Sequence, residues 1–231
     1  TIESVRADGK KVPFTQKDGR LTVEAKGARA LEFSYRVKPQ DVRGNAETAY
    51  GLIRDKYSGR MWTLTWPYNT GSLFPSNSAP SDGSTAKVTV KVGGESKALA
   101  TGTQKTASTF ESKAEAPAYA VALYTSKDFN IGAGGKSRGG VTVSSYGAGD
   151  SAPEKARDAY RKAAVDALDF YSSWLGNYDY GPTLKMVELS GGLGGMEHTA
   201  AVAIMLNAAR DPETARETAA HETAHHWFGD N

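Results

Sequence analysis

The histidines of this chain constrain its fold more than any other feature of the sequence. All four lie in the last 34 residues, and His221 and His225 enclose Glu222 in the pattern H-E-x-x-H. On a helix, side chains four positions apart lie one above the other, with Cβ atoms roughly 5–6 Å apart. His221 and His225 can then bind one metal ion, while Glu222 projects to the side and can accept a proton without binding the metal. The pattern therefore predicts a helix that carries the zinc site of a hydrolase.

The competing interpretation is that these three residues are ordinary polar groups on a solvated helix face. The pattern fixes only three positions, and chance matches occur. That interpretation leaves the concentration of every histidine in one part of the chain without a reason, so we favour the metal site. Zinc is the expected metal, because neutral imidazoles and a carboxylate suit it and because a catalytic zinc ion keeps one coordination position open.

Composition narrows the class of protein. Of the 231 residues, 39% are apolar and 23% are charged, which is ordinary for globular proteins of one large or two smaller domains. The 28 basic and 26 acidic residues leave a net charge of +2 without runs of like charge, so no nucleic-acid partner is indicated. The sequence contains no cysteine, which excludes disulfides and thiolate ligands. No apolar run approaches the roughly 18 residues of a membrane span, so we expect a soluble protein, either cytoplasmic or secreted to the periplasm or beyond.

Residues 1 to about 130 show the alternation that is typical of β-strands. Short runs such as 21–25, 61–66 and 86–92 alternate apolar and polar side chains between turn-forming residues. This pattern predicts an antiparallel β-sandwich whose sheets each bury one face. The stretch 131–140 contains five glycines, and we interpret it as the boundary between two domains. A long hairpin loop inside one domain is the alternative.

Extended and helical patterns alternate after residue 140. Residues 141–146 and 184–189 are predicted as strands. Between them, Ser151 and Glu154 form a capping-box pattern, which predicts a helix with Ser151 as its N-cap. Apolar side chains recur on this helix at spacings of three and four residues, and we expect the aromatic ones to lie in the core. These are Tyr160, Phe170 and Trp174.

The last helix is expected to begin just after Asp211. An Asp at the N-cap followed by Pro212 at the first helical position is a common start signal. The H-E-x-x-H pattern then lies about three turns into this helix.

A second motif, Gly194-Gly195-Met196-Glu197-His198, precedes the last helix. Together, G-x-M-E-N/H followed within a few tens of residues by H-E-x-x-H-x-W-F-G resembles the M1 family of zinc aminopeptidases, the aminopeptidase N-like gluzincins. Segments 73–77, 119–129 and 170–182 are similar to other parts of the family pattern and occur in the same order. The resemblance is strongest in the C-terminal third of the chain.

The resemblance implies an α+β fold. An N-terminal antiparallel β-sandwich domain, residues 1–135, would precede the first part of a thermolysin-like catalytic domain, residues 136–231. The opening strands of the β domain and the end of the catalytic domain would lie outside this chain.

The resemblance also assigns roles within the site. It implies that His221 and His225 bind the zinc ion and that Glu222 is the general base for hydrolysis of an N-terminal peptide bond by a metal-activated water. Glu197 would bind the free α-amino group of the peptide substrate. The backbone of three residues would approach the bound peptide closely, since glycine permits such contact. These are Gly194, Gly195 and Met196.

Other parts of the family's site are expected beyond Asn231, namely a Glu as third zinc ligand and a Tyr that stabilises the transition state. We therefore expect this chain to be a fragment that binds zinc weakly and hydrolyses no peptide alone, with the remainder of the catalytic domain as its partner. His198 and His226 stand where many family members have Asn and Gln. We expect both to be supporting residues rather than zinc ligands.

Two other functions stay open. A gluzincin endopeptidase would use the same zinc chemistry, although it would not need the G-G-M-E element. A non-catalytic binding scaffold of the M1 type would not need both histidines and Glu222. Neither the preferred side chain of the substrate nor the compartment follows from the sequence.

Overall fold

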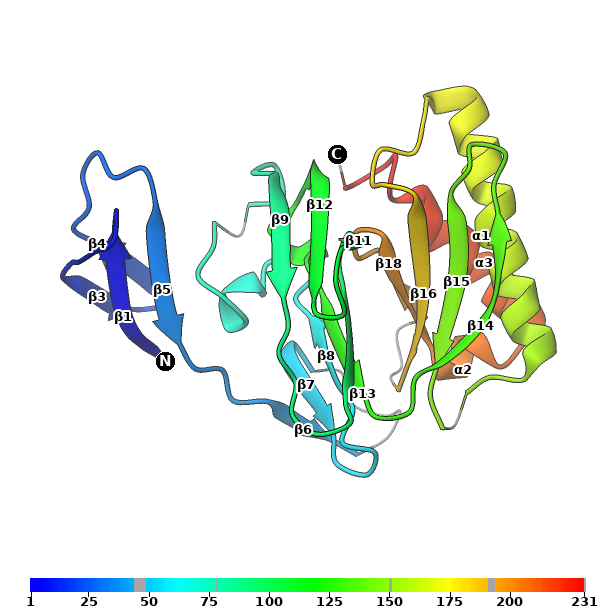
Figure 1. The fold of residues 1–231 in the computed structure, drawn as a ribbon, viewed down its shortest axis with the longest axis horizontal. Coiled ribbons are helices and arrows are strands. Elements are labelled where there is room, and N and C mark those ends of the chain that lie inside the picture. Colours follow the sequence, from blue (N-terminus) through cyan, green and yellow to red (C-terminus); the bar gives the residue numbers. More distant parts are fainter. Residues whose placement is uncertain (44–48, 78, 150, 191–193, 231) are drawn as a thin grey trace.

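Strands make up most of the first part of the molecule (Figure 1). The computed structural model describes residues 1–43, 49–77, 79–149, 151–190 and 194–230. The strands of the first part are β1 (Ile2–Ala7), β2 (Lys10–Lys11), β3 (Phe14–Lys17), β4 (Arg20–Val23), β5 (Leu31–Tyr35), β6 (Gln40–Val42), β7 (Gly51–Asp55), β8 (Met61–Leu64), β9 (Ser84–Thr89), β10 (Lys97–Ala100), β11 (Thr103–Gln104), β12 (Thr109–Ala116) and β13 (Leu123–Ser126). In the described part of the chain, the short 3-10 helices η2 (Thr70–Ser72) and η3 (Ala118–Ala120) interrupt them.

These strands form four sheets within the described residues. Their orders are β2-β1-β5, β3-β4, β10-β13-β8-β7-β6 and β11-β12-β9. The pairs are antiparallel except for β6 with β7, which is parallel. Side chains point alternately to the two faces of these strands. In the first half of β12 every second residue is buried, and Phe110 lies in the core. The predicted α+β class with an antiparallel β-rich first part is confirmed.

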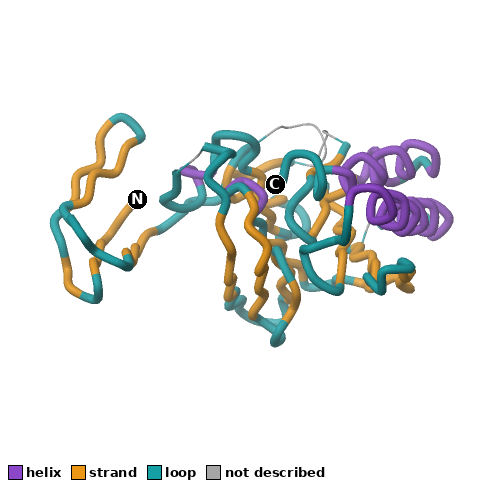
Figure 2. Tube along the Cα trace, turned by 90° about the horizontal axis from the view of Figure 1, so that it is seen from above, coloured by secondary structure: helices purple, strands orange, loops and turns teal. Residues whose placement is uncertain are grey.

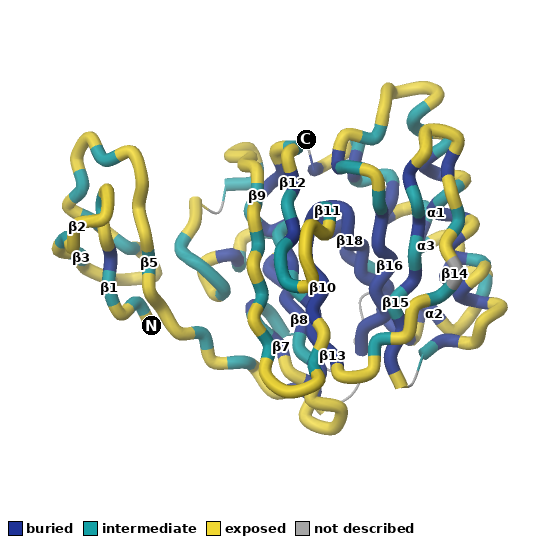
Figure 3. The backbone as a smooth tube through the Cα atoms, in the orientation of Figure 1, coloured by how far each residue is buried: buried dark blue, intermediate teal, exposed yellow. Residues whose placement is uncertain are grey.

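A mixed sheet forms the second part of the molecule. Its order is β14 (Asn130–Lys136), β15 (Thr142–Gly147), β16 (Thr183–Leu189), β18 (Ala201–Met205) and β17 (Gly195–Met196). The three central strands are parallel, and the two edge strands are antiparallel to them. Every residue of β18 is buried, as is typical of parallel strands covered on both faces (Figure 3). Along the chain, the Gly194–Glu197 motif comes after β16, and the helix with the H-E-x-x-H pattern comes after β18. Both motifs are therefore attached to buried strands.

The glycine-rich stretch 131–140 lies in β14 and the turn after it. Its glycines allow close packing, since a Cβ at Gly132 would lie 2.2 Å from Ser145 Oγ and 2.4 Å from Arg161 Nη1. The stretch is therefore a strand of the mixed sheet, paired with β15. The division into domains 1–135 and 136–231 stays a prediction.

Helices gather at one end of the molecule, beyond the mixed sheet (Figure 2). They are α1 (Glu154–Leu175), α2 (Leu206–Ala209) and α3 (Pro212–Ala224). The predicted start of α3 is confirmed, because the Asp211 carboxylate accepts a hydrogen bond of 2.8 Å from Thr214 N. Within the described residues, none of the helices combines the length and the apolar character that crossing a membrane requires.

Two details of the prediction for α1 are wrong. Its N-cap is Pro153 rather than Ser151, because the Ser151 hydroxyl donates to Ala148 O and the Glu154 carboxylate pairs with Arg161 Nη2 at 2.7 Å. Tyr160 is fully buried as expected, whereas Phe170 and Trp174 are 59% and 69% exposed. The last turns of α1 extend past the ends of the strands of the mixed sheet (Figure 1). There the Phe170 ring contacts the rings of Tyr171 and Trp174 on the same helix.

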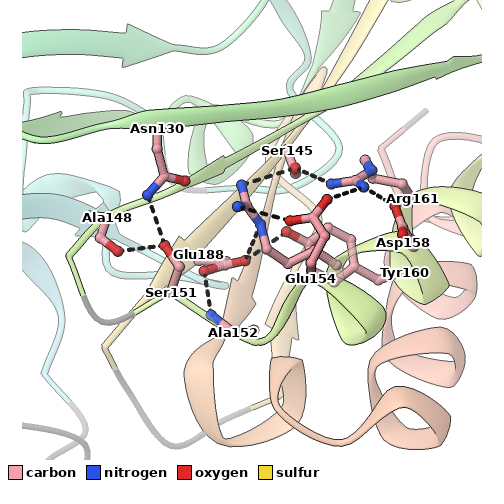
Figure 4. A network of polar contacts seen from close by, with 11 residues as sticks. Asn130, Ser145, Ala148, Ser151, Ala152, Glu154, Asp158, Tyr160, Arg161 and Glu188 are labelled. Atoms are coloured by element: carbon pink, nitrogen blue, oxygen red, sulfur yellow. Dashed lines mark hydrogen bonds and ion pairs between the residues drawn. The ribbon is translucent and has the colours of Figure 1, made fainter.

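A buried polar network fixes α1 on the mixed sheet (Figure 4). Glu188 of β16 accepts hydrogen bonds from the Tyr160 hydroxyl at 2.7 Å and from Ala152 N at 3.0 Å, and Arg157 Nε lies 3.2 Å from its carboxylate. Arg161 donates to Ser145 of β15 at 2.8 Å. Since α1 in turn packs against α3, this network positions the helix that carries H-E-x-x-H.

The β-rich part and the mixed sheet share one hydrophobic core and are joined by hydrogen bonds. Gly102 N donates to Thr199 O at 3.1 Å, and Thr199 N donates to Ala120 O at 3.0 Å. Lys185 of β16 is 3% exposed, and its amine donates to Gly102 O at 2.5 Å. These bonds hold the segment 198–200, next to Glu197, against the β-rich part.

Lys185 is expected to make the free energy of unfolding increase as the pH rises above about 7. Burial lowers the pKa of its amine to about 7 from the ordinary 10.5. Between these two values the unfolded chain binds more protons than the folded chain, so stability is gained as pH rises and lost as pH falls toward the folded value. Chemical denaturation should show a larger increase from pH 7 to about pH 9.5 for the wild type than for Lys185→Met. Equal increases would contradict a neutral buried amine.

Candidate metal centre

The two histidines of the motif face each other on α3. His221 Nε2 and His225 Nε2 are 3.2 Å apart. His225 Nδ1 lies 2.9 Å from Phe228 O, and because a carbonyl only accepts, Nδ1 carries the proton. His225 Nε2 therefore presents a lone pair toward His221. An imidazole whose second nitrogen donates to a carbonyl is the usual arrangement of a metal-ligating histidine.

This geometry fits a zinc ion. Two nitrogens at about 2.0–2.1 Å from one tetrahedral zinc ion lie about 3.3 Å apart, close to the spacing of the two imidazoles. His221 is exposed and His225 is half-buried, so solvent reaches one side of the pair. The donor set contains no sulfur, and nitrogen with carboxylate oxygen suits zinc.

Glu222 lies beside the histidines but points into the protein. Its side chain contacts Gly195 of β17, since a Cβ at Gly195 would lie 2.5 Å from Glu222 Cγ and Oε1. Glu222 is 6% exposed, and burial together with the charge of Glu197 raises its pKa to about 8. The ligand atoms of Glu197, Glu222 and His225 all lie within 4.8 Å of one another. The structure thus brings the two sequence motifs into one site.

Glu197 reaches this site from the segment after β17. Its carboxylate is buried and lies close enough to the Tyr119 hydroxyl of η3 to act on the pKa of that group. Burial, followed by the negative charges of Glu197 and Asp230, raises the pKa of Tyr119 well above its ordinary value, so the hydroxyl keeps its proton. Glu197 therefore lies where the β-rich part meets the mixed sheet. Nothing in the sequence indicates that Tyr119 lies next to Glu197.

Gly194 forms a bend that leads directly into β17. Gly194 has a φ of +86°, which favours glycine, and its carbonyl accepts from Met205 N at 2.8 Å. Met196 pairs with Ala203 of β18, and its side chain is buried in the shared core. Contact of Gly194 and Met196 with a bound peptide would therefore come from their backbone.

His198 and His226 are buried and make hydrogen bonds within the protein, and neither belongs to the group of Glu197, Glu222 and His225. The Tyr124 hydroxyl donates to Ala201 O at 2.7 Å, so His198 Nδ1, 2.7 Å from the same hydroxyl, is the donor to it. His226 Nε2 accepts from Ala200 N at 3.1 Å. Burial lowers the pKa of His198 to about 3 and that of His226 to about 4, so both are neutral. Both hold the segment that follows Glu197.

Asp230 is a further carboxylate next to the cluster. It is fully buried, and among the described residues neither of its carboxylate oxygens makes a hydrogen bond. Burial, and then the charges of Glu197 and Glu222, raise its pKa to about 9. Its backbone carbonyl accepts from the Tyr180 hydroxyl at 3.1 Å.

Comparison with solved structures relates the fold of the chain to that of known enzymes. The chain is similar to the crystal structure of an M1 zinc metallopeptidase from Deinococcus radiodurans, with a TM-score of 0.76 and 21% identity over 100% of this chain and 54% of that one. Its fold is that of the M1 zinc metallopeptidases. The chain is also similar to the structure of an M1 zinc metallopeptidase mutant from Deinococcus radiodurans bound to a Tyr-Ser-Ala substrate. The TM-score is 0.75 and the identity is 20%, over 100% of this chain and 55% of that one. A two-domain M1 mutant bound to L-arginine gives the same four values.

The chain spans about half the length of these M1 structures. No protein-family model matches the sequence, and comparison with curated proteins gives no match. The relation to the M1 fold therefore rests on three-dimensional similarity.

Proposed function

We propose that the protein is a zinc-dependent aminopeptidase, which hydrolyses the N-terminal peptide bond of peptides with a free N-terminus. The observation that carries this proposal is the convergence of the His221–His225 pair with two buried carboxylates, Glu222 and Glu197, from separate elements. The M1 fold supports it, as does the binding of a tripeptide substrate by a solved protein of that fold.

His221 and His225 would hold the zinc ion through Nε2. When bound, zinc lowers the pKa of a water toward about 7 and polarises the carbonyl of the scissile bond. Glu222 accepts the proton of the attacking water and passes it to the leaving amine. Its raised pKa suits this exchange, because a general base works best when its pKa lies near the working pH. A bound cation would lower this pKa toward neutrality.

Glu197 would bind the α-ammonium group of the substrate. A buried carboxylate beside the Tyr119 hydroxyl provides a partner for a cation, and charge-assisted hydrogen bonds are among the strongest in proteins. Because Glu197 and Glu222 lie in one cluster, the ammonium would be held close to the proton acceptor. This fixed separation favours cleavage after the first residue.

Glu197→Gln is expected to remove most of the preference of the full-length protein for free over N-acetylated substrates. Loss of a charge opposite a buried ammonium costs roughly 2–5 kcal/mol in binding. The measurement is kcat/KM for paired free and acetylated aminoacyl substrates. Tyr119→Phe should reduce the same preference by a smaller amount, about 1 kcal/mol. An unchanged ratio in Glu197→Gln would mean that the amine is bound elsewhere, and hydrolysis of internal bonds by the wild type would favour an endopeptidase.

Gly195→Ala is expected to lower kcat while zinc stays bound. The added Cβ would lie within 2.5 Å of the Glu222 side chain, which must then turn away from its position. Misplacement of a catalytic group by about 1 Å can reduce the rate roughly 10²-fold. Gly71→Ala is a suitable control, because a Cβ there would meet nothing within 4 Å. If Gly195→Ala were as active as this control, Glu222 would not need its present position.

A further inference from the structure

A cavity of about 580 Å³ lies where the β-rich part meets the edge of the mixed sheet. The β-rich part contributes residues 90–92 and 96–99 to its lining, and the mixed sheet side contributes Phe129, Ile131 of β14 and Tyr146 of β15. None of these residues belongs to the candidate metal centre. Ligand-binding cavities have volumes of about 300–1,000 Å³, so this one has room for a small organic molecule.

Most side chains around the cavity are apolar. Ile131 and Tyr146 are opposite each other in the antiparallel pair of β14 and β15, so their side chains lie on the same face of the sheet. The Phe129 ring packs edge-to-face with the Tyr146 ring, with centroids 6.4 Å apart. Val92 and Leu99 add apolar surface from the β-rich part. Ile131 is 69% exposed, so a molecule in the cavity can cover apolar surface that otherwise contacts water.

The charged side chains of the cavity are both basic. Lys91 and Lys97 line it from the segment that joins β9 to β10 and from the start of β10. Both are exposed, and among the described residues neither ammonium group forms an ion pair. The described residues that line the cavity include no Asp or Glu, and Glu95 of the same segment lies outside the lining. The three donors of each ammonium group are therefore available to an anion.

These two features together select the chemistry of an occupant. A cation would be repelled by the two lysines, and a purely polar anion would leave the apolar surface in water. A molecule with an apolar chain and one carboxylate satisfies both, because the chain covers the apolar side chains and the carboxylate accepts charge-assisted hydrogen bonds from the ammonium groups.

We propose that this cavity binds a medium-chain fatty acid, with its chain against Ile131 and Phe129 and its carboxylate paired with Lys91 and Lys97. Since the lining comes from both sides of the junction, the bound molecule contacts the β-rich part and the mixed sheet at once. The site requires neither zinc nor peptide hydrolysis, so it does not rest on the proposed function.

The test is titration calorimetry of the zinc-loaded full-length protein with decanoate, below the concentration at which micelles form. Decanoate should saturate one site per chain. Acetate, which lacks the chain, and decyltrimethylammonium, which carries the opposite charge, should show no binding. From hexanoate to decanoate, each added methylene group should tighten binding by about two- to fourfold, because burial of one methylene group is worth up to about fourfold in affinity.

Three variants at exposed positions separate the contributions of charge and chain. The double variant Lys91→Gln/Lys97→Gln should weaken decanoate binding at least about tenfold, because the charge-assisted hydrogen bonds are lost. Ile131→Asn should weaken it by about two- to fourfold, the effect of one buried methylene group or slightly less. Lys155→Gln removes an exposed lysine of α1 outside the cavity and should leave the affinity unchanged.

A carboxylate can also bind zinc, so the titration is repeated with His221→Ala, which should bind decanoate as tightly as the wild type does. Loss of binding in His221→Ala, with full affinity in the double lysine variant, would place the ligand at the zinc ion and overturn the proposal. Equal binding of decanoate and decyltrimethylammonium, or binding that does not saturate, would overturn it as well.

Discussion

Glu222→Gln is expected to leave zinc bound to the full-length protein and to abolish peptide hydrolysis. The amide keeps the shape of the side chain against Gly195 but cannot accept the proton of the attacking water. Loss of a general base typically lowers the rate by about 10²–10⁴-fold. His221 and His225 keep their Nε2 atoms, so zinc content by elemental analysis should stay near one ion per chain.

The control for this variant is Glu217→Gln, which removes an exposed carboxylate from the same helix. It should retain full activity, so that a loss in Glu222→Gln cannot be attributed to the charge of α3. Glu222→Gln with zinc retained and more than about a tenth of wild-type turnover would remove Glu222 from the role of base.

His221→Ala and His225→Ala are each expected to remove zinc binding. The two imidazoles are the nitrogen donors that face each other in the site, and zinc normally needs at least three protein ligands. We expect a loss of affinity well above 10²-fold, since even a residue that only orients a ligand contributes about 10–100-fold. Zinc titration monitored by thermal unfolding should show no zinc-dependent rise in melting temperature.

His198→Asn tests whether His221 and His225, and not His198, are the histidines that bind zinc. This imidazole is bound to Tyr124 in the core, so its loss should lower the melting temperature while the rise on adding zinc persists. If His198→Asn lost that rise and His221→Ala kept it, the ligand assignment would be wrong.

The sequence predicted the parts of the fold that local patterns determine. Asp211 and Pro212 set the start of α3, and alternation predicted the strands of the β-rich part. β18 was not assigned, because a five-residue apolar run has no periodicity that separates a buried parallel strand from a helix. Ser151 does not cap α1 because its hydroxyl donates a hydrogen bond to the carbonyl of Ala148 instead. A short sequence motif does not show such competing hydrogen bonds.

In the candidate site, too, local patterns predicted some residues, while others are brought there only by the folded chain. His221, Glu222 and His225 follow from helical spacing alone, and Glu197 from its motif. Tyr119 and Asp230 could not be predicted as neighbours of Glu197, because they come from positions far apart in the chain that only the folded core brings together. The burial of both residues, and the carboxylate oxygens of Asp230 that make no hydrogen bond among the described residues, are visible only in three dimensions.

The central claim is that His221 and His225 bind zinc while Glu222 stays outside its coordination shell. The structure also holds a competing donor set, Glu197, Glu222 and His225, whose ligand atoms lie within 4.8 Å of one another. X-ray absorption at the zinc edge, on the zinc-loaded full-length protein and its Glu222→Gln and His221→Ala variants, separates the two. We predict two imidazoles in the wild-type shell, an unchanged shell in Glu222→Gln, and loss of one imidazole or of zinc in His221→Ala. A single imidazole in the wild type, with a shell altered by Glu222→Gln and not by His221→Ala, would contradict the account.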